Sequence, residues 1–321
     1  MNQIRTETLN EKPLLIYNPV ANQGSANKTL PKVQELFEVF NYDYDLRLTE
    51  YPGHALELAK QAAESGRKTI IAAGGDGTMN EVINGLMRAD LKDQKRPILG
   101  VLPVGRGNDF SFGVDVAPEL EKNIRAIVEG NVRKIDIGIV SGGDYPDGRY
   151  FGNGVGLGFD TVVGFEAAKI KWARGAASYL LGLIRTIFLY HTAPTYEIEL
   201  DNETITQPSL LVSIMNGKRM GGTFHMAPDG DPGDGVFNLC VASQVPQIKI
   251  LPLATKFISG TQAGHPAIRM LQSKKVRVKA ITGFIPAHAD GETICVAGNE
   301  LLIELIPQAL EVISMEGNPE Q

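Results

Sequence analysis

Residues 68–87 read KTIIAAGGDGTMNEVINGLM, and this stretch decides what kind of sheet the chain can build. Thr69 to Ala73 is a short apolar run with β-branched residues that ends at glycine, which is typical of a buried strand. Three glycines follow within residues 74–77, so the backbone can approach a bulky ligand closely. Apolar residues then recur at helical spacing as far as Met87, which predicts a helix with one buried face.

The start of this helix carries a capping signal. Thr78 is a good N-cap residue, and Glu81 three positions later completes a capping-box pattern. The glycine turn therefore lies in front of a helix N-terminus, where N–H groups and the helix dipole bind phosphate well. The common fingerprints GxxxxGK[ST] and GxGxxG after a strand do not occur. Asp76 would repel phosphate unless a metal or a donor lay between them.

The composition is typical of a globular protein. The chain has 321 residues, 43% hydrophobic and 21% charged, enough for one or two domains with a sizeable core. A net charge of −6 gives no support for nucleic-acid binding, so we expect no nucleic-acid partner. Cys240 and Cys295 are far apart, which excludes a CxxC pair and indicates a reducing compartment. The polar N-terminus and the lack of ~18 consecutive apolar residues predict a cytoplasmic protein without signal peptide or transmembrane helix.

In the first part of the chain, strand-like and helix-like segments alternate after a loose tail of about twelve residues. We expect strands at 14–17, 42–48, 69–73 and 97–102, and helices around 33–40, 55–63, 78–87 and 120–128. This alternation predicts a parallel, doubly wound sheet, in which ligands lie at the carboxyl ends of the strands. Turns at Asn18, Thr49, 74–78 and 105–109 all follow strands, so they should converge on one crevice.

The second part is mainly strand-like. The expected strands are 134–140, 150–160, 196–201, 209–216, 237–242, 275–281 and 301–306, interrupted by helical stretches at about 163–173, 176–190 and 247–259. Such a pattern predicts a β-sandwich. The fold class is therefore α/β, with an N-terminal doubly wound nucleotide-binding domain over 1–135 and a C-terminal mainly-β sandwich domain over 136–306.

Several short motifs, in this order and spacing, carry a resemblance to a known family. They are Asn18-Pro19, Gly74 to Thr78 with Asn80-Glu81, Gly105-x-Gly107-Asn108-Asp109-Phe110, Lys134 to Gly138, Asn216-Gly217, Gly221-Gly222, Ala227-Pro228, Asp234-Gly235 and Asp290-Gly291-Glu292. With them the chain resembles the bacterial diacylglycerol kinase-like lipid kinases, soluble relatives of sphingosine kinases and, more distantly, of NAD kinases and phosphofructokinases. The resemblance implies that the last segment, 307–321, returns to the first domain and that 308–315 packs on its sheet.

The resemblance also implies that ATP and Mg²⁺ are used. The N–H groups of Gly75, Gly77 and Thr78 are candidates for the nucleotide phosphates. The other residues that we expect to line the ATP site are Asn18, Thr49, Gly74, Asp76, Gly105, Arg106, Gly107 and Asn108. Arg106 stands where the family most often has threonine or serine. Its guanidinium either contacts phosphate directly or points to solvent.

Two carboxylate motifs are candidates for the chemistry. Asp76 is the best protein ligand for the Mg²⁺ carried by ATP, directly or through water, and Asp109 is either a weaker candidate or an Asx-type cap. On spacing alone, Asp290 in HADGE is a residue of a DG hairpin turn. The resemblance makes Asp290 the general base instead, with Glu292 orienting it. His288 is read as a strand residue.

A second metal site is implied by the loop DPGDGV, residues 231–236. In the family such a loop holds a structural Mg²⁺, here through the Asp234 side chain and the carbonyl groups of Asp231 and Val236, with Asp136 in support. A solvated acidic turn is the alternative. Whether the metal would be structural or regulatory stays open.

The stretch GAASYLLGLIRTIFLY, residues 175–190, is strongly apolar, contains one charge, Arg185, and is too short to span a bilayer. It is either a core helix or the wall of an acyl-chain tunnel whose mouth, near Lys169, Lys171 and Arg174, touches anionic headgroups. We expect a lipid substrate and local, transient, peripheral contact with a membrane surface. Pairing of two subunits into a homodimer through an edge strand stays open.

Three functions remain in view. The first is an ATP- and Mg²⁺-dependent lipid kinase, with diacylglycerol as the default acceptor and phosphatidylglycerol, a sphingoid base or a polyprenol as alternatives. The second is an NAD kinase-like phosphotransferase with a soluble acceptor. The third is a non-catalytic nucleotide- or lipid-sensing module, against which the intact Asp76, Asp290 and Glu292 count.

Overall fold

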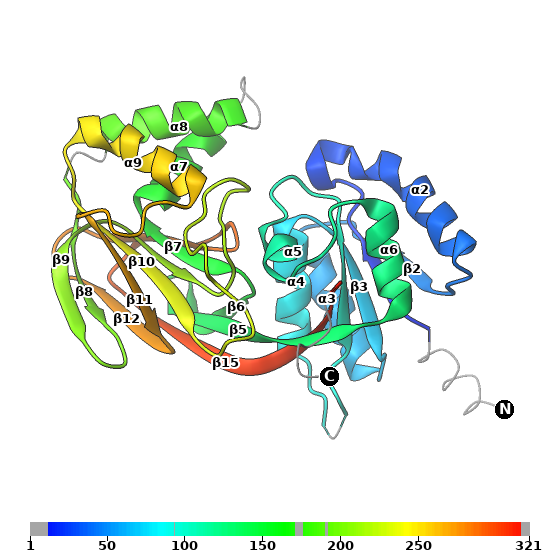
Figure 1. Cartoon of the computed structure of the whole chain (residues 1–321). Coiled ribbons are helices and arrows are strands. Elements are labelled where there is room, and N and C mark those ends of the chain that lie inside the picture. Colours follow the sequence, from blue (N-terminus) through cyan, green and yellow to red (C-terminus); the bar gives the residue numbers. More distant parts are fainter. Residues whose placement is uncertain (1–11, 93, 171–175, 190–191, 316–321) are drawn as a thin grey trace.

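The computed structural model describes residues 12–92, 94–170, 176–189 and 192–315. The expected tail lies, except for Lys12, outside the described residues. Figure 1 shows an α/β part at the N-terminal end of the chain and a part with many strands in its second half, with the long strand β15 passing between them. The predicted fold class is confirmed.

The first part is built on four parallel strands in the order β4-β3-β1-β2. They are β1 (Leu14–Tyr17), β2 (Asp45–Leu48), β3 (Thr69–Gly74) and β4 (Ile98–Pro103). Strand β2 is three residues shorter than expected, because Tyr42 and Tyr44 pack their rings on Phe37 instead of pairing with β1. The parallel order is the one that the alternating sequence pattern predicts.

Helices cover both faces of this sheet. They are η1 (Ala21–Gly24), α2 (Ala26–Val39), α3 (His54–Glu64), α4 (Asp76–Met87), α5 (Asp109–Gly113) and α6 (Leu120–Glu129). Ile70 and Ala72 of β3 pack in the core that α3 and α4 close, while Ile71 and Ala73 pack in the core that α2 and α6 close. Because side chains alternate along a strand, β3 is buried on both faces. The sheet is therefore doubly wound.

The second part is a β-sandwich whose two sheets share one long strand, β9. One sheet has the order β14-β13-β7-β9-β10-β11, and the other runs from β9 through β8, β12 and β15 to β5 and β6. The strands are β5 (Val132–Gly142), β6 (Tyr145–Phe151), β7 (Gly154–Gly158), β8 (Thr195–Glu199), β9 (Thr204–Met215), β10 (Phe237–Ser243), β11 (Ile268–Ser273), β12 (Lys275–Ala280), β13 (Ile285–Ala289), β14 (Glu292–Gly298) and β15 (Glu300–Ile313). Their inward side chains form one apolar core.

Three helices cover the outer face of the first of these sheets (Figure 1). They are α7 (Phe159–Lys169), α8 (Ala176–Leu189) and α9 (Gln247–Ser259). The strand expected over 150–160 is interrupted by a bend at 152–153, and its last two residues already belong to α7. At the crossing of α7 and α8, a Cβ on Gly182 would lie 2.8 Å from the Val163 carbonyl oxygen, so the two helices touch through backbone there.

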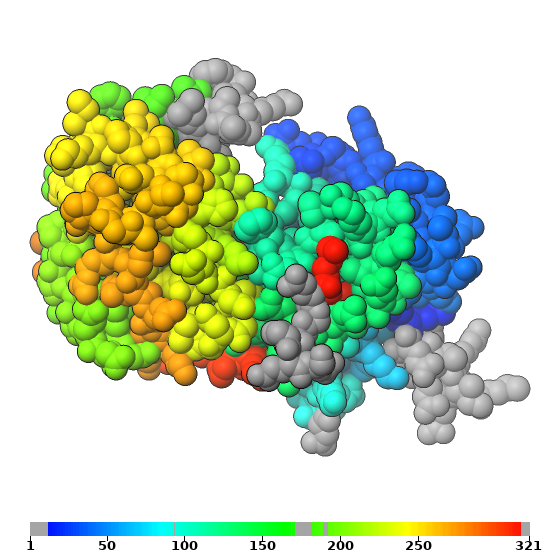
Figure 2. All heavy atoms as spheres, viewed as in Figure 1, coloured from blue at the N-terminus to red at the C-terminus, as the bar shows by residue number. Residues whose placement is uncertain are grey.

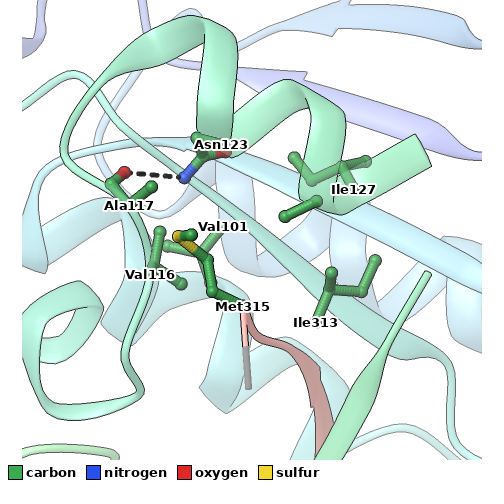
Figure 3. Close-up of a pocket in the computed structure, with 8 residues that line it drawn as sticks. Val101, Val116, Ala117, Asn123, Ile127, Ile313 and Met315 are labelled. Atoms are coloured by element: carbon green, nitrogen blue, oxygen red, sulfur yellow. Dashed lines mark hydrogen bonds between the residues drawn. The ribbon is translucent and has the colours of Figure 1, made fainter. Parts of the chain in front are cut away.

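Strand β15 belongs to both parts. Leu301 to Ile306 pair with β5 in the sandwich, and β12 pairs along the other side of the same stretch. After a register shift between Ile306 and Leu310, Val312 lies beside Leu99 of β4 in parallel. Figure 3 shows Ile313 and Met315 against β4 and α6, around a small cavity in which Asn123 donates a hydrogen bond to the Ala117 carbonyl group.

The start of α4 corrects one prediction. The helix begins at Asp76 with Gly75 as the N-cap residue, so Thr78 is not the cap and the capping-box interpretation is wrong. The Thr78 hydroxyl accepts a hydrogen bond from Asn18 Nδ2 at 2.9 Å. The Glu81 carboxylate accepts the N–H groups of Gly53 and Ala55, so it caps the start of α3 instead. The beginnings of these two helices are thereby tied together.

Asp136 of β5 joins the shift in β15 to the loop 231–236. It is fully buried, and its carboxylate accepts the N–H groups of Gln308 and Gly235, each at 2.7 Å. Gln308 has a φ of 47°, a left-handed conformation that a non-glycine residue rarely adopts. The carboxylate therefore holds the point at which β15 leaves the sandwich.

Asp136→Asn leaves one of these buried N–H groups opposite an amide nitrogen and removes the charge that strengthens both hydrogen bonds. We expect a loss of about 3 kcal/mol in the free energy of unfolding, measured by urea denaturation. Asp147→Asn, at an exposed position of β6, is the matched control and should stay within about 0.5 kcal/mol of the wild type. Equal stability of the two variants would contradict this role.

Candidate active site

The motif HADGE forms a tight hairpin between β13 and β14. Asp290 and Gly291 have φ values of 49° and 86°, as a two-residue turn of type I′ requires. The prediction of a DG turn is thus confirmed. The turn also places the Asp290 side chain inside the molecule, where 9% of the residue is exposed.

The Asp290 carboxylate binds the bend that interrupts the strand expected over 150–160. Oδ1 accepts the N–H groups of Asn153 and Gly154 at 3.0 and 2.9 Å, and Oδ2 accepts the Gly152 N–H at 2.8 Å. Oδ2 also accepts Asn80 Nδ2 of α4 at 3.1 Å. Burial raises the pKa of Asp290, and these four donors oppose that rise.

Asn80 connects α4 to the hairpin, a role that the sequence did not suggest. Its Oδ1 accepts Nε and Nη2 of Arg149 at 3.0 and 2.6 Å, so its Nδ2 must face Asp290. Arg149, on β6, also donates to the Tyr145 hydroxyl group at 3.0 Å. No local pattern in the sequence marks Arg149, because its partner Asn80 lies 69 residues away.

Glu292 lies at the N-terminal end of α4. Its Oε1 is 3.3 Å from the point that a Cβ on Gly77 would occupy, and its Oε2 is 3.8 Å from Arg149 Nη2. The side chain is 43% exposed. The hairpin near the end of the chain and the glycine turn near its beginning therefore share one site.

The backbones of the two glycine turns in the first part approach each other closely. A Cβ on Gly105 would lie 2.3 Å from Cα of Gly75, and a Cβ on Gly74 would overlap the Thr78 side chain. Both positions therefore require glycine. The first N–H groups of α4, including those of Gly77 and Thr78, have no carbonyl partner one turn earlier, so they are available to an anion at this helix end.

Asp76 fixes the second glycine turn to the first. Its Oδ1 accepts the N–H groups of Asp109 and Phe110 at 2.7 and 3.2 Å and so caps α5. Its Oδ2 lies 2.7 Å from the point that a Cβ on Gly107 would occupy. Oδ1 is thus occupied by backbone, and Oδ2 is the oxygen that lies at the glycine turn.

Asp109 connects this turn to the second part of the chain. Its carboxylate accepts Arg219 Nε at 3.0 Å and the Gly222 N–H at 2.9 Å, so it does not cap its own turn as an Asx-type residue would. Burial, together with the nearby charge of Asp76, raises the pKa of Asp109 to about 6. Arg219 also donates to the Gly107 carbonyl group and lies over the Phe112 ring. No local pattern in the sequence marks Arg219.

The remaining candidates for the nucleotide site lie around these turns. Asn18 follows β1, and Thr49 follows β2 with its N–H donating to the Tyr17 carbonyl group. Asn108 has a φ of 52° and donates to the Gly105 carbonyl group. Arg106 is exposed. These positions agree with turns at the carboxyl ends of neighbouring parallel strands.

Three carboxylates lie near one another at the loop 231–236: Asp231 and Asp234 of the loop itself and Asp136 of β5. Asp231 pairs with Arg133 and accepts the Gly233 N–H, and Asp234 accepts the Val236 N–H at 3.1 Å. Burial, with the charges of Asp231 and Asp136, raises the pKa of Asp234. A bound cation would relieve this repulsion. Over 12–92, 94–170, 176–189 and 192–315, no group of three or more His, Cys, Asp or Glu side chains is placed so that it could hold a metal ion.

A groove of about 600 Å³ opens between α7 and the β13–β14 edge of the sandwich. Its lining is mostly apolar, with Val162, Phe165, Phe284, Pro286 and Val296 among its residues. Glu166 and Lys169 also line it and form an ion pair with each other. The other two basic residues expected near the mouth of a lipid tunnel, at 171 and 174, lie outside the described residues.

Within the described part of the chain, no helix has both the length and the apolar character to cross a bilayer. His288 lies in β13, as expected, with its Nε2 3.6 Å from Asp160 Oδ2.

Two family models match most of the chain. Residues 12–140 match the diacylglycerol kinase catalytic domain, and residues 153–314 match the YegS C-terminal NAD kinase beta sandwich-like domain. A diacylglycerol kinase of Bacillus subtilis is 32% identical over 87% of this chain and 88% of its own.

Solved structures share the fold. A putative diacylglycerol kinase from Bacillus anthracis superimposes with a TM-score of 0.74 at 25% identity, covering 97% of this chain and 98% of its own. An NAD kinase from Archaeoglobus fulgidus in complex with ATP has a TM-score of 0.53 at 14% identity, with 95% and 94% covered. The chain therefore belongs to the diacylglycerol kinase family, within the superfamily that includes the NAD kinases, and it is a lipid kinase.

Proposed function

We propose that the protein transfers the γ-phosphate of ATP to the hydroxyl group of a lipid, with diacylglycerol as the default acceptor and Mg²⁺ as the metal. The observation that carries the proposal is the meeting of the Asp290–Glu292 hairpin with the N-terminus of α4, through Asn80 and Gly77. Phosphoryl transfer needs bound phosphates, a divalent metal and a proton acceptor within one site. Candidates for all three converge here.

Each part of the site has a task in this proposal. The N–H groups at the start of α4 bind phosphate oxygens, and the contact between Gly75 and Gly105 keeps the second turn close enough to line the nucleotide. Oδ2 of Asp76 would hold Mg²⁺, directly or through water, and the metal would offset charge on the phosphates. The hairpin carboxylates receive the acceptor hydroxyl group.

The lipid acceptor is supported by the groove beside α7. Its size and mostly apolar lining suit a chain of methylene groups better than a second nucleotide. An NAD kinase-like reaction on a soluble acceptor would leave this apolar surface without a ligand. A non-catalytic sensor would leave the partly exposed Glu292 carboxylate without a task.

The test uses ATP labelled in the γ-phosphate, a lipid extract and the wild-type protein. We expect label in an organic-soluble product, and Asp290→Asn should lower its formation at least 100-fold, because the variant disturbs a buried carboxylate of the site. Asp147→Asn, at an exposed site, is the control. Label only in the aqueous phase would support the second function, and bound ATP without product would support the third. Mass spectrometry of the labelled lipid would identify the acceptor.

The loop 231–236 is proposed to bind a second Mg²⁺. The Asp234 carboxylate and the carbonyl groups of Asp231 and Val236 would hold it, and Asp136 would keep the loop in place through the Gly235 N–H. The positive charge of the metal would reduce the repulsion among the carboxylates of Asp136, Asp231 and Asp234.

Millimolar Mg²⁺ should raise the melting temperature of the nucleotide-free protein, because binding to the native state alone stabilises it. The rise should be absent in Asp234→Asn. Asp229→Asn, which changes an aspartate just outside the loop, is the control and should keep the wild-type rise. An equal rise in all three proteins would contradict a site in this loop.

We further propose that α8 and α9 contact an anionic membrane surface while the enzyme takes up its substrate. Ile248, Leu251 and Ile258 of α9 are 84, 47 and 47% exposed, and they recur at helical spacing on the outer face. Phe188 of α8 is 72% exposed, and α8 is joined to α9 by a hydrogen bond from Gln247 to the Ile187 carbonyl group. Figure 2 shows α9, in yellow, on the outer surface of the sandwich.

The charged residues of α8 and α9 also favour contact with an anionic membrane surface. Their sequences contain three basic residues, Arg185, Lys249 and Lys256, and no acidic residue, in a protein with a net charge of −6. Basic residues beside exposed apolar side chains attract anionic lipids.

The variant Ile248→Ser/Leu251→Ser should bind vesicles that contain phosphatidylglycerol about tenfold more weakly, because it removes two apolar side chains from the interface. Phosphorylation of a short-chain, water-soluble diacylglycerol should not change. The control is Val20→Ser/Val39→Ser, which replaces two exposed apolar residues of the first part, 72 and 65% exposed. Vesicle binding that falls equally in both variants would contradict docking through α9.

A further inference from the structure

A row of polar side chains crosses the outer face of the sandwich sheet beneath α7. The strands β13, β7, β9 and β10 contribute one residue each, in register: His288, Gly156, Ser213 and Cys240. Paired residues of neighbouring strands point to the same face of a sheet. The neighbours of these four residues along each strand belong to the apolar core between the two sheets, so the row itself faces α7.

Asp160, in the first turn of α7, lies over this row. A Cβ on Gly156 would overlap Asp160 Oδ2 and lie 2.6 Å from His288 Nε2. The side chains of Asp160 and His288 therefore meet over Gly156, where only glycine leaves room for both. We call Asp160, Ser213 and His288 the polar cluster.

The polar cluster has hydrogen-bonding capacity that the protein does not use. Within the described residues, both oxygens of Asp160, the Ser213 hydroxyl group and Nδ1 of His288 are buried without a hydrogen-bond partner. Nε2 of His288 lies 3.6 Å from Asp160 Oδ2, beyond hydrogen-bond distance. Burial, together with the charge of Asp160, raises the pKa of Cys240 to about 12, so the carboxylate acts on the row beneath it. Buried polar groups that lack partners in this way require an explanation.

The polar cluster lies between the apolar groove and the hairpin. Pro286 and Val162 line the groove, and His288 and Asp160 are each two residues from them, on β13 and α7. The hairpin turn begins at Asp290, two residues after His288. At about 3.3 Å per residue, β13 runs about 13 Å from the groove to the turn. A lipid with its chain in the groove and its reacting hydroxyl group at the hairpin would therefore pass the cluster.

Access to the polar cluster is from the surface. The side chains of His288 and Asp160 are 16 and 18% exposed, whereas Ser213 is fully buried behind them. The cluster is thus deep enough to exclude most water and shallow enough to receive a group from the groove.

We infer that the polar cluster binds the part of the lipid between the acyl chain and the reacting hydroxyl group, and that it selects a lipid with a second hydrogen-bond donor there, a hydroxyl or an amino group. The inference rests on the proposed kinase function and deepens it. Asp160 can only accept hydrogen bonds, and Nδ1 of His288 is an acceptor when Nε2 carries the hydrogen toward the carboxylate. Diacylglycerol has only ester oxygens in this part, which are acceptors as well.

The test uses two matched lipids with ATP labelled in the γ-phosphate. One is a monoacylglycerol, and the other is the same ester of a glycerol analogue that lacks the central hydroxyl group. Both have the same chain and the same reacting primary hydroxyl group. The wild type should phosphorylate the monoacylglycerol with a kcat/KM higher by about tenfold or more, because the analogue leaves the buried carboxylate without its donor.

Asp160→Asn should lower kcat/KM for the monoacylglycerol about tenfold and leave that for the analogue within about twofold of the wild type, because the amide nitrogen is not an acceptor. Asp147→Asn, at an exposed position of β6, is the control and should keep the wild-type preference.

A structural role of Asp160, or a cluster filled only by water, would lower kcat/KM equally for both lipids in Asp160→Asn. That result overturns the inference, and so does a wild type whose preference for the monoacylglycerol is below about tenfold. A wild type that labels diacylglycerol but shows no such preference leaves the proposed function intact. Failure to label any lipid overturns the proposed function, and this inference with it.

Discussion

The structure depends on one buried carboxylate at a hairpin turn. Asp290 comes 210 residues after Asn80 in the sequence, yet the two side chains are hydrogen-bonded. The same carboxylate also accepts hydrogen bonds from the bend at Gly152–Gly154. This bend has no apolar side chain that could pack it in place. Buried N–H groups without a partner are costly, so the bend, the hairpin and the start of α4 can adopt their positions only together.

Two other buried aspartates also hydrogen-bond segments of the chain that are far apart in the sequence. Asp109 reaches Arg219 and Gly222, and Asp136 reaches Gly235 and Gln308. In each case one member of the contact lies on or beside a glycine turn, where no bulky side chain could mediate the contact. Hydrogen bonds to charged groups, instead of apolar packing, therefore set the distances within the site.

Local patterns predicted the parallel sheet, its helices and the glycine turns, because burial period, glycine and turn residues act over a few positions. The capping box failed because Glu81 finds its partner at Gly53, 28 residues earlier, and not three residues earlier. Arg149 and Arg219 escaped notice for the same reason, since their partners lie 69 and 110 residues away. The prediction that Asp290 belongs to the same site as the glycine turn came from the resemblance to a family and not from a local pattern. The different environments of Asp290 and Glu292 are visible only in the structure.

Because strand β15 belongs to both parts of the molecule, the two parts cannot be separated simply. It pairs with β12 at one end and with β4 at the other, and β5 runs beside both ends. A cut between the first part and the sandwich would therefore have to divide β5 and β15, whose backbone pairing extends to both sides of the register shift between Ile306 and Leu310. Neither part could be grafted onto a relative without its share of this strand.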